Sequence, residues 1–183
     1  NQRIKLNKSI NLSIQGFADA DWASDCDDRR STTGHCIFLG GNPVSWCAKK
    51  QPTISRSSTK SEYRSVASTT AEVMWTEALI KELGIKLSCK TIIWCDNSST
   101  VALSANPVLH ARTEHIEIDL YFVRDQIAKG KLEVNHLPAS SQIADIFTKV
   151  ISRKYFEDLK NKLCIKTFPK NRSKRKKRNP NRN

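Results

Sequence analysis

The chain has 183 residues, of which 38% are hydrophobic, and it carries a formal net charge of +13 at pH 7. This length suits one globular domain with a hydrophobic core and leaves little room for two. The sequence contains neither a secretory h-region nor an apolar run of membrane length, so we expect no membrane partner. Its six cysteines form no C-x-x-C pair, which argues against a zinc site and favours a reducing, intracellular setting.

The first fifty residues predict a meander of three antiparallel strands. Residues 12–20 alternate between apolar and polar side chains, as a half-buried strand does. Residues 35–41 and 43–50 are short apolar runs joined by a Gly-Gly-Asn-Pro turn. Three aspartates that precede the second strand, and that we interpret as turn residues, are Asp25, Asp27 and Asp28.

A long helix is predicted over residues 56–84. Apolar side chains recur in it at three- and four-residue spacing, Ser57 or Ser58 can cap its start, and Gly84 can end it. The rest of the chain predicts a buried strand, two helices separated by Pro107, a strand and a last amphipathic helix, at 89–96, 97–106, 112–130, 131–138 and 141–163. This order indicates one α/β domain over residues 1–168.

The end of the chain has a different composition. Residues 170–183 contain eight basic residues and no acidic one. Because residues 169–183 offer almost nothing apolar that could pack, we expect a basic disordered tail there. Positive charge of this kind favours a polyanionic partner, nucleic acid first, while a solvated tail and a nuclear-import signal are the alternatives.

Four acidic residues stand where functional groups gather. Asp19 and Asp96 each come at the end of a predicted strand, and Glu62 lies early in the long helix. In open α/β sheets such side chains converge outside the strand ends. Asp96 could equally cap the helix that follows it. Asp145 could either complement the dipole of the last helix or face the other three acids.

Converging carboxylates favour a metal site. Without a counter-charge they repel one another, and divalent cations remove that repulsion. Their oxygen ligands suit Mg²⁺ or Mn²⁺. Two such ions roughly 4 Å apart can activate a water and stabilise the leaving oxygen of a phosphodiester. The sequence shows no P-loop, G-x-G-x-x-G, nucleophile elbow or zincin pattern, so a competing chemistry or a small-molecule cofactor is not indicated.

Several long sequence blocks point to one family. They read G-F-A-D-A-D-W-A, D-R-R-S-T-T-G, S-S-T-x-x-E-Y and A-D-I-F-T-K. Between about residue 8 and residue 163 the chain closely resembles the ribonuclease H domain of copia-type LTR retrotransposon Pol polyproteins. The resemblance implies a ribonuclease H-like fold: a mixed five-stranded sheet, with two parallel strands added to three antiparallel ones, flanked by helices. The initial Asn1 and the single Met74 also lead us to expect a segment of a longer polyprotein.

The same resemblance implies an activity and its metal ligands. The activity is endonucleolytic hydrolysis of the RNA strand of RNA–DNA hybrids during reverse transcription, with two Mg²⁺ or Mn²⁺ ions. The family's four acidic positions fall on Asp19, Glu62, Asp96 and Asp145. Asp19 would bridge both ions. Glu62 and Asp96 would hold the ion on the leaving-group side, and Asp145 would hold the ion that activates water.

The resemblance also implies partners. They are an RNA–DNA hybrid and the reverse transcriptase domain of the same polyprotein, in a cytoplasmic virus-like particle, with nuclear entry as a further option. Selectivity for RNA requires groups that touch 2′-hydroxyls. Candidates beside the strand-end aspartates are Arg30, Ser31, Thr32, Ser98 and Ser99.

Other interpretations of the same residues stay open. In many ribonucleases H a mobile catalytic histidine precedes the last helix. Ser140 stands at that position here, and we interpret His136 as a strand residue. One alternative to the hydrolase is an inactive retrotransposon-derived domain that only binds nucleic acid. The other is a D-D-E strand-transfer enzyme, which the spacing of the A-D-I-F-T-K block fits less well.

Overall fold

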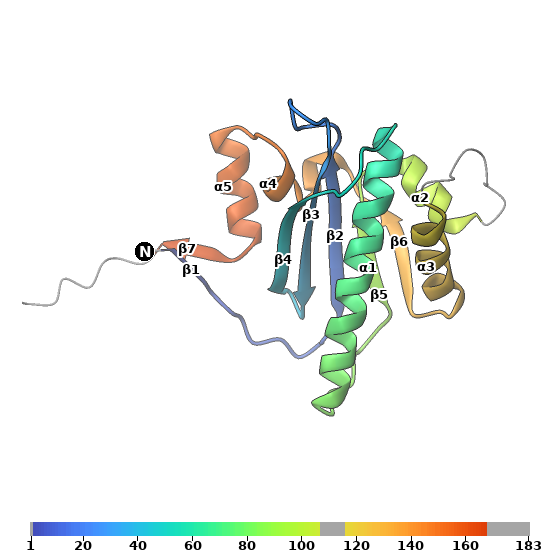
Figure 1. Ribbon diagram of the computed structural model, residues 1–183. Helices are drawn as coiled ribbons and strands as arrows, with labels where there is room; N and C mark the ends of the chain where they lie inside the picture. Colours follow the sequence, from blue (N-terminus) through green and yellow to red (C-terminus); the bar gives the residue numbers. More distant parts are fainter. Residues whose placement is uncertain (1, 107–115, 168–183) are drawn as a thin grey trace, which may run out of the picture.

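A mixed five-stranded sheet forms the centre of the computed structural model, which describes residues 2–106 and 116–167 (Figure 1). The strand order is β4-β3-β2-β5-β6. The bounds are β2 Ile14–Asp21, β3 Thr32–Leu39, β4 Asn42–Lys50, β5 Thr91–Cys95 and β6 Leu132–His136. β2, β3 and β4 pair antiparallel, whereas β5 is parallel to β2 and β6 is parallel to β5. The predicted mixed sheet is therefore confirmed.

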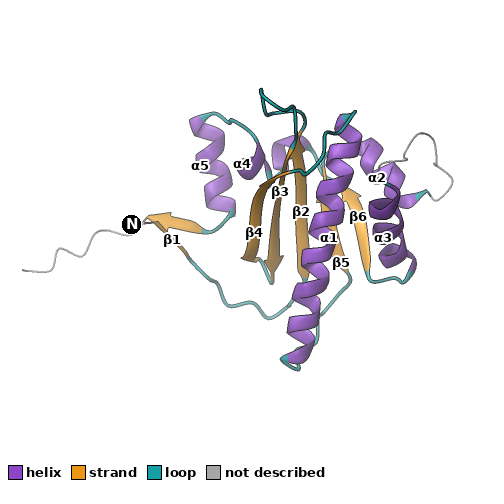
Figure 2. Cartoon of the chain, viewed as in Figure 1, coloured by secondary structure: helices purple, strands orange, loops and turns teal. Residues whose placement is uncertain are grey.

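Helices cover both faces of this sheet (Figure 2). On one face lie α1 Ser58–Glu82, α2 Ser98–Ala105 and α3 Glu117–Ala128. On the other lie the short α4 Asp145–Thr148 and α5 Arg153–Lys162, preceded by a 3-10 turn, η1, at Ala139–Ser141. α1 is the longest helix of the described residues and packs along β2 and β3 (Figure 1).

Alternation along β3 explains why both faces of the sheet are apolar. Ile37 packs in one core cluster with Val66 of α1. Its neighbours Cys36 and Phe38 pack in a second cluster with Ile143, which precedes α4. Successive side chains of a strand point to opposite faces, so one strand contributes to both clusters.

The ends of α1 agree with the sequence prediction. The hydroxyl of Ser57 accepts a hydrogen bond from the backbone N–H of Lys60 at 3.3 Å, which caps the first turn. Gly84 follows the last turn with a φ of +71°, a conformation that costs glycine little. The Ser57 cap fixes where α1 begins, and thus where Glu62, in its second turn, is held.

The C-terminal region differs from the single helix predicted over 141–163. The structure has α4, an extended linker and α5 there. Lys149 leaves the helix with φ −111° and ψ 148°, and Ser152 caps α5 by accepting from the N–H of Tyr155 at 3.3 Å. Three of the four residues at 148–151 are β-branched, which weakens a helix, and Ser152 then offers a competing N-cap.

A second, two-stranded sheet was not predicted. β1 Gln2–Ile4 pairs antiparallel with β7 Ile165–Thr167, next to α5 (Figure 1). Each strand has three residues, which is too short for an alternating pattern to be recognised. Its consequence is that the first residues of the chain are joined to the segment that follows α5.

Some predictions fall on residues that the structure does not describe. Pro107, the first part of the helix predicted over 112–130 and the basic tail over 169–183 lie outside the described ranges. The described part of that helix is α3, which begins at Glu117. Within the described ranges, the helices are all too short or too polar to cross a membrane.

Candidate active site

The parallel pairing of β2 and β5 sets two carboxylates side by side. Ala18 lies opposite Cys95 in this register, so the residues that follow them, Asp19 and Asp96, lie at the same level. Asp19 is fully buried, and the Asp96 side chain keeps 12% of its surface exposed. Asn97, and not Asp96, is the N-cap of α2. The carboxylate of Asp96 is therefore free of the capping role that the sequence left open.

Two helices bring the other two acids. Glu62 lies in the second turn of α1, Asp145 is the first residue of α4, and both are buried. One carboxylate oxygen each of Asp19, Asp96 and Asp145 lie within 4.8 Å of one another. Ligand atoms of Glu62, Cys95 and Asp96 form a second such group. The four acids predicted from the sequence thus converge at one place, and we call them the carboxylate cluster.

A lysine that the sequence prediction missed reaches into the carboxylate cluster. The Lys149 Nζ lies 2.7 Å from Asp145 Oδ1, 3.0 Å from Asp19 Oδ1 and 3.8 Å from Asp96 Oδ2. It follows Asp145 by four residues in the A-D-I-F-T-K block. That i,i+4 spacing of opposite charges was the signal that could have identified it.

Two hydroxyl groups fix the orientation of the carboxylates. The Thr148 hydroxyl donates to Asp19 Oδ2, and the Tyr155 hydroxyl lies 3.2 Å from Asp145 Oδ2. Gly34 lies opposite Asp19 in the β2–β3 pairing, and a Cβ placed there would come 2.5 Å from Thr148 Cγ2. The glycine therefore allows α4 to approach the strand closely enough for Thr148 to reach Asp19.

Burial and repulsion raise the pKa values of the acids. Burial, followed by the charges of Asp19 and Asp96, raises the pKa of Glu62 to about 9. Burial is also the largest cause that raises the pKa of Asp96 and of Asp145, and the charge of Asp19 adds to it. For Lys149, burial favours a lower pKa, but the contacts with Asp145 and Asp19 outweigh it and raise the pKa. The ammonium group is therefore charged, and the carboxylate cluster keeps an excess of acidic groups.

The donor set fits a divalent metal ion. All four side chains offer carboxylate oxygens, which Mg²⁺ and Mn²⁺ prefer. Oε2 of Glu62 is buried and has no hydrogen-bond partner among the described residues. A buried polar atom without a partner is costly, and a bound cation would supply one. Asp19, Glu62, Asp96 and Asp145 are thus the residues that could hold metal.

The other aspartates of the β2–β3 connection serve the turn, as predicted. Oδ1 of Asp25 accepts from the backbone N–H groups of Asp27 and Asp28 at 2.9 and 3.1 Å. Lys50 Nζ lies 2.9 Å from Asp28 Oδ2 and also pairs with Asp25. These contacts give the turn its own counter-charge, away from the carboxylate cluster.

The candidates for nucleic-acid contact divide into two groups. Ser98 and Ser99 are exposed in the first turn of α2, two and three residues after Asp96. Ser31 is fully buried and accepts from the backbone N–H of Ala23 at 3.1 Å. The hydroxyl of Ser31 is therefore used inside the turn, and its contact with nucleic acid stays a prediction.

Arg30 and Thr32 lie on either side of this buried serine. Nε of Arg30 lies 2.6 Å from Asp28 Oδ2, and the Thr32 hydroxyl lies 3.3 Å from that of Ser24. Both side chains are partly exposed. Their contact with nucleic acid stays a prediction, and so does that of the two serines of α2.

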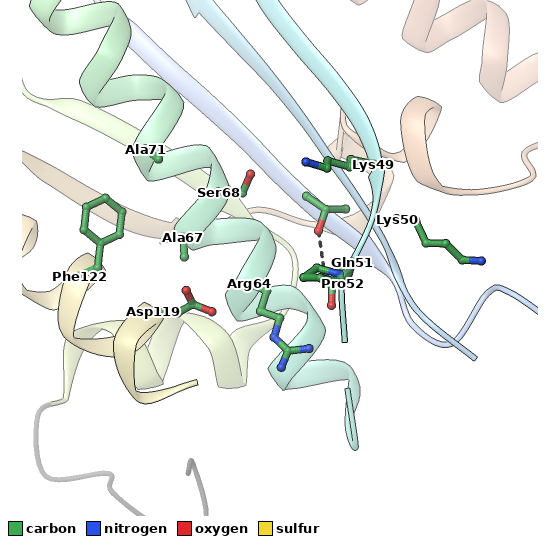
Figure 3. Close-up of a pocket in the computed structure, with 11 residues that line it drawn as sticks. Lys49, Lys50, Gln51, Pro52, Arg64, Ala67, Ser68, Ala71, Asp119 and Phe122 are labelled. Atoms are coloured by element: carbon green, nitrogen blue, oxygen red, sulfur yellow. Dashed lines mark hydrogen bonds between the residues drawn. The ribbon is translucent and has the colours of Figure 1, made fainter. Parts of the chain in front are cut away.

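A pocket of about 420 Å³ lies between the end of β4, α1 and α3 (Figure 3). Lys49, Lys50 and Arg64 line it together with Asp119. Arg64 follows Glu62 on α1, so the same helix contributes to the pocket and to the carboxylate cluster. The lining thus has three basic side chains and one acidic one, and it includes no member of the carboxylate cluster.

Sequence comparison relates the chain to transposon polyproteins. It is 45% identical over 169 residues to the retrovirus-related Pol polyprotein from transposon RE1 of Arabidopsis thaliana, an alignment that covers 92% of the chain and 12% of the polyprotein. To the corresponding polyprotein from transposon TNT 1-94 of Nicotiana tabacum it is 34% identical over 144 residues, which are 79% of the chain and 11% of that protein. The chain therefore spans about an eighth of the length of these relatives. A scan against protein-family models finds no match.

Structural comparison relates the fold to ribonucleases H. LC11-RNase H1 in complex with an RNA/DNA hybrid superposes with a TM-score of 0.55 at 11% identity, covering 74% of this chain and 94% of that one. The N-terminal RNase H domain of rv2228c from Mycobacterium tuberculosis gives a TM-score of 0.53 at 11% identity, covering 82% and 98%. At such identities the likeness shows the fold. The chain thus has the ribonuclease H fold and belongs to the family of retrovirus-related Pol polyproteins of transposons.

Proposed function

We propose that this chain hydrolyses the RNA strand of RNA–DNA hybrids with the help of divalent metal ions, as part of a transposon Pol polyprotein. One observation carries the proposal: four carboxylates from β2, α1, α4 and the end of β5 converge on a ribonuclease H fold. The substrate class is supported by LC11-RNase H1, which has the same fold and is in complex with an RNA/DNA hybrid.

Two Mg²⁺ or Mn²⁺ ions would be held by Asp19, Glu62, Asp96 and Asp145, with Asp19 shared between them. Bound there, the ions would supply a water of lowered pKa and stabilise the charge of the leaving oxygen. The chain's part is to present deprotonated oxygens in fixed positions. Glu62 must lose the proton that its raised pKa favours in the metal-free state.

The side chains around the carboxylates restrict their movement. Thr148 holds one oxygen of Asp19, and Tyr155 holds one oxygen of Asp145. Each bond leaves the second oxygen of its carboxylate in contact with Lys149. Carboxylates that are already oriented lose less conformational entropy when they bind metal and substrate.

Exposed polar groups near the cluster could recognise the hybrid. Ser98 and Ser99 begin α2 directly beyond Asp96, where hydroxyls could bond to the 2′-hydroxyls that distinguish RNA from DNA. Lys49 and Arg64 line the pocket of Figure 3, where positive charge could meet the phosphate backbone.

A reverse transcriptase domain is the partner that we propose within the polyprotein. The foamy viral protease-reverse transcriptase in complex with an RNA/DNA hybrid superposes with a TM-score of 0.50 and 10% identity, covering 85% of this chain and 21% of that one. Such a fusion would deliver the hybrid directly from synthesis to hydrolysis. We further propose a cytoplasmic virus-like particle as the setting of this step.

A cleavage assay tests the proposed function. The purified chain is incubated with a hybrid labelled on either strand, with Mg²⁺ or Mn²⁺, and with EDTA as a control. We expect the RNA strand alone to be cut, leaving 3′-hydroxyl and 5′-phosphate ends, and duplex DNA and duplex RNA to stay intact. Binding of the hybrid without cleavage under all metal conditions would instead favour a domain that only binds nucleic acid.

A further inference from the structure

We propose that the ammonium group of Lys149 occupies the cation position of the carboxylate cluster when metal is absent, and that a metal ion must displace it to bind. Lys149 would then be a built-in competitor that weakens metal affinity and stabilises the metal-free fold. The inference rests on the proposed function in one respect: it takes the carboxylate cluster as a site for divalent metal.

Lys149 contacts the same three carboxylates that could bind a metal ion. Its Nζ lies within 3.0 Å of Asp19 and Asp145 and 3.8 Å from Asp96. The same three residues offer carboxylate oxygens within 4.8 Å of one another. The ammonium group fills the place between these oxygens that a metal ion would need in order to bind all three carboxylates, and the two positive charges also repel each other.

The lysine, and not the carboxylates, is the part that can move. Asp19 and Asp145 are buried and are held by the hydroxyls of Thr148 and Tyr155. Lys149 keeps 34% of its side-chain surface exposed and stands at the end of α4, where the backbone is already extended. Its neighbour Val150 is fully exposed, so solvent lies next to the lysine. A long flexible side chain at such a position can swing outward without disturbing the sheet.

Displacement would make the position of the Lys149 side chain, inside the cluster or in solvent, depend on metal binding. Buried carboxylates without a counter-charge destabilise a fold, and Lys149 supplies that counter-charge in the metal-free protein. A metal ion supplies a larger charge to the same oxygens. The chain would therefore stay folded without metal, and the lysine would become available to solvent, and to a nearby polyanion, when metal binds.

A matched pair of variants tests the competition. Lys149→Met removes the ammonium group and keeps most of the side-chain volume. Lys129→Met is the control, because Lys129 forms an i,i+4 pair with Asp125 at 2.5 Å on the exposed end of α3 and lies outside the cluster. Mg²⁺ and Ca²⁺ are titrated into each purified protein by calorimetry, and thermal unfolding is followed with and without EDTA.

The expected result is metal binding at least about tenfold tighter in Lys149→Met than in the wild type, since one repelling charge has gone. The variant should melt at a lower temperature than the wild type in EDTA. Addition of Mg²⁺ should raise its melting temperature by more than it raises that of the wild type. Lys129→Met should match the wild type in metal affinity. Equal or weaker metal binding by Lys149→Met would overturn the proposal while leaving the metal site intact. Absence of binding in every protein would contradict the metal site itself, and this inference with it.

A second measurement needs no variant to fold. The wild-type chain is treated briefly with acetic anhydride in EDTA or in Ca²⁺, and acetylation of each lysine is quantified by mass spectrometry. Lys149 should be modified several-fold faster with Ca²⁺, because the metal has released its amine, whereas Lys129 should react equally in both. An unchanged or slower reaction of Lys149 with Ca²⁺ would show that the lysine is not displaced.

Discussion

The hydroxyl of Tyr155 lies 3.2 Å from Oδ2 of Asp145, although the two residues belong to different helices. The contact exists because α4 ends at Thr148 and the chain turns before α5 begins. A single continuous helix would not bring position 155 back to position 145, since residues ten apart lie nearly three turns away. The break between α4 and α5 is therefore part of the candidate active site.

The first prediction concerns this contact. Tyr155→Phe should reduce hybrid cleavage about 10-fold, since Asp145 loses a partner that orients it. The free energy of unfolding should fall by only about 1 kcal/mol, the usual contribution of one hydrogen bond. Tyr121→Phe on exposed α3 is the control and should change neither property. Steady-state cleavage and urea unfolding of both variants provide the check, and full activity in Tyr155→Phe would contradict the positioning role.

The second prediction concerns Gly34. Gly34→Ala should destabilise the chain by about 1–3 kcal/mol and reduce cleavage, because the added methyl would lie 2.5 Å from Thr148 Cγ2 and force α4 outward. Thr148→Ser removes that Cγ2 and keeps the hydroxyl that reaches Asp19. The double variant should therefore recover part of the stability. Denaturant unfolding of the two single variants and the double variant measures this coupling, and additive effects would argue against the clash.

The third prediction follows from the pKa of Glu62. Folding raises it from 4.5 to about 9, so the folded chain binds more protons than the unfolded chain between these values. In EDTA the free energy of unfolding should therefore fall as pH rises through this window, by up to about 1.4 kcal/mol per pH unit from this group.

Glu62→Gln tests this pH dependence. The neutral amide removes the titrating group, so the variant should lose less stability than the wild type between pH 5 and pH 9. Asp96 and Asp145, whose pKa values are also raised, stay in both proteins, so the difference in slope reports Glu62. Urea unfolding at several pH values supplies the slopes. Parallel curves for the two proteins would mean that Glu62 does not change protonation on folding.

Local signals in the sequence were sufficient to predict the sheet and the convergence of the four acidic side chains. Alternation along β2 and the apolar run of β5 predicted Asp19 and Asp96 at or near strand ends, and the structure makes these strands neighbours, with Asp19 two residues before the end of β2. The caps at Ser57 and Gly84 fixed the length of α1 and hence the place of Glu62. Such features depend on residues close in the chain, which is why they can be read without a structure.

The contacts that form because α4 ends at Thr148 could not be predicted in the same way. Apolar periodicity continues through 141–163, and three β-branched residues are a weak signal against it. With the helix assumed continuous, Tyr155 would be interpreted as a distant residue, and Lys149 would be recognised only as an i,i+4 partner of Asp145. The burial of Ser31 could not be predicted for a related reason, since it follows from how the β2–β3 turn folds over it.

The fourth prediction tests the central carboxylate. Asp19→Asn keeps the shape of the side chain and removes the charge that both metal ions would share, so hybrid cleavage should fall below detection with Mg²⁺ or Mn²⁺. Circular dichroism and thermal unfolding should show that the variant is folded. Asp25→Asn is the matched control, because Asp25 serves the turn and should leave cleavage unchanged. Cleavage retained by Asp19→Asn would remove it from the metal site.

The last prediction concerns the basic residues at 170–183, which the sequence alone defines. Their eight positive charges come without acidic or aromatic neighbours, so they can neutralise phosphates but offer little for reading a structure. Deleting them should weaken binding to hybrid, duplex DNA and duplex RNA alike, and should leave cleavage at saturating hybrid nearly unchanged. Each phosphate contact that is lost should flatten the log–log dependence of affinity on salt by roughly 0.9 for duplex DNA.

Filter-binding titrations of the full and shortened chains across a salt series decide between the roles of this segment. A smaller salt slope for the shortened chain, equal on all three nucleic acids, is expected of contacts to phosphate that carry no sequence or strand information. Identical slopes for the two chains would exclude such contacts and leave the two alternatives, a nuclear-import signal or a solvated tail. A loss confined to the hybrid would show instead that these residues help to distinguish a hybrid from the other duplexes, which phosphate neutralisation alone cannot do.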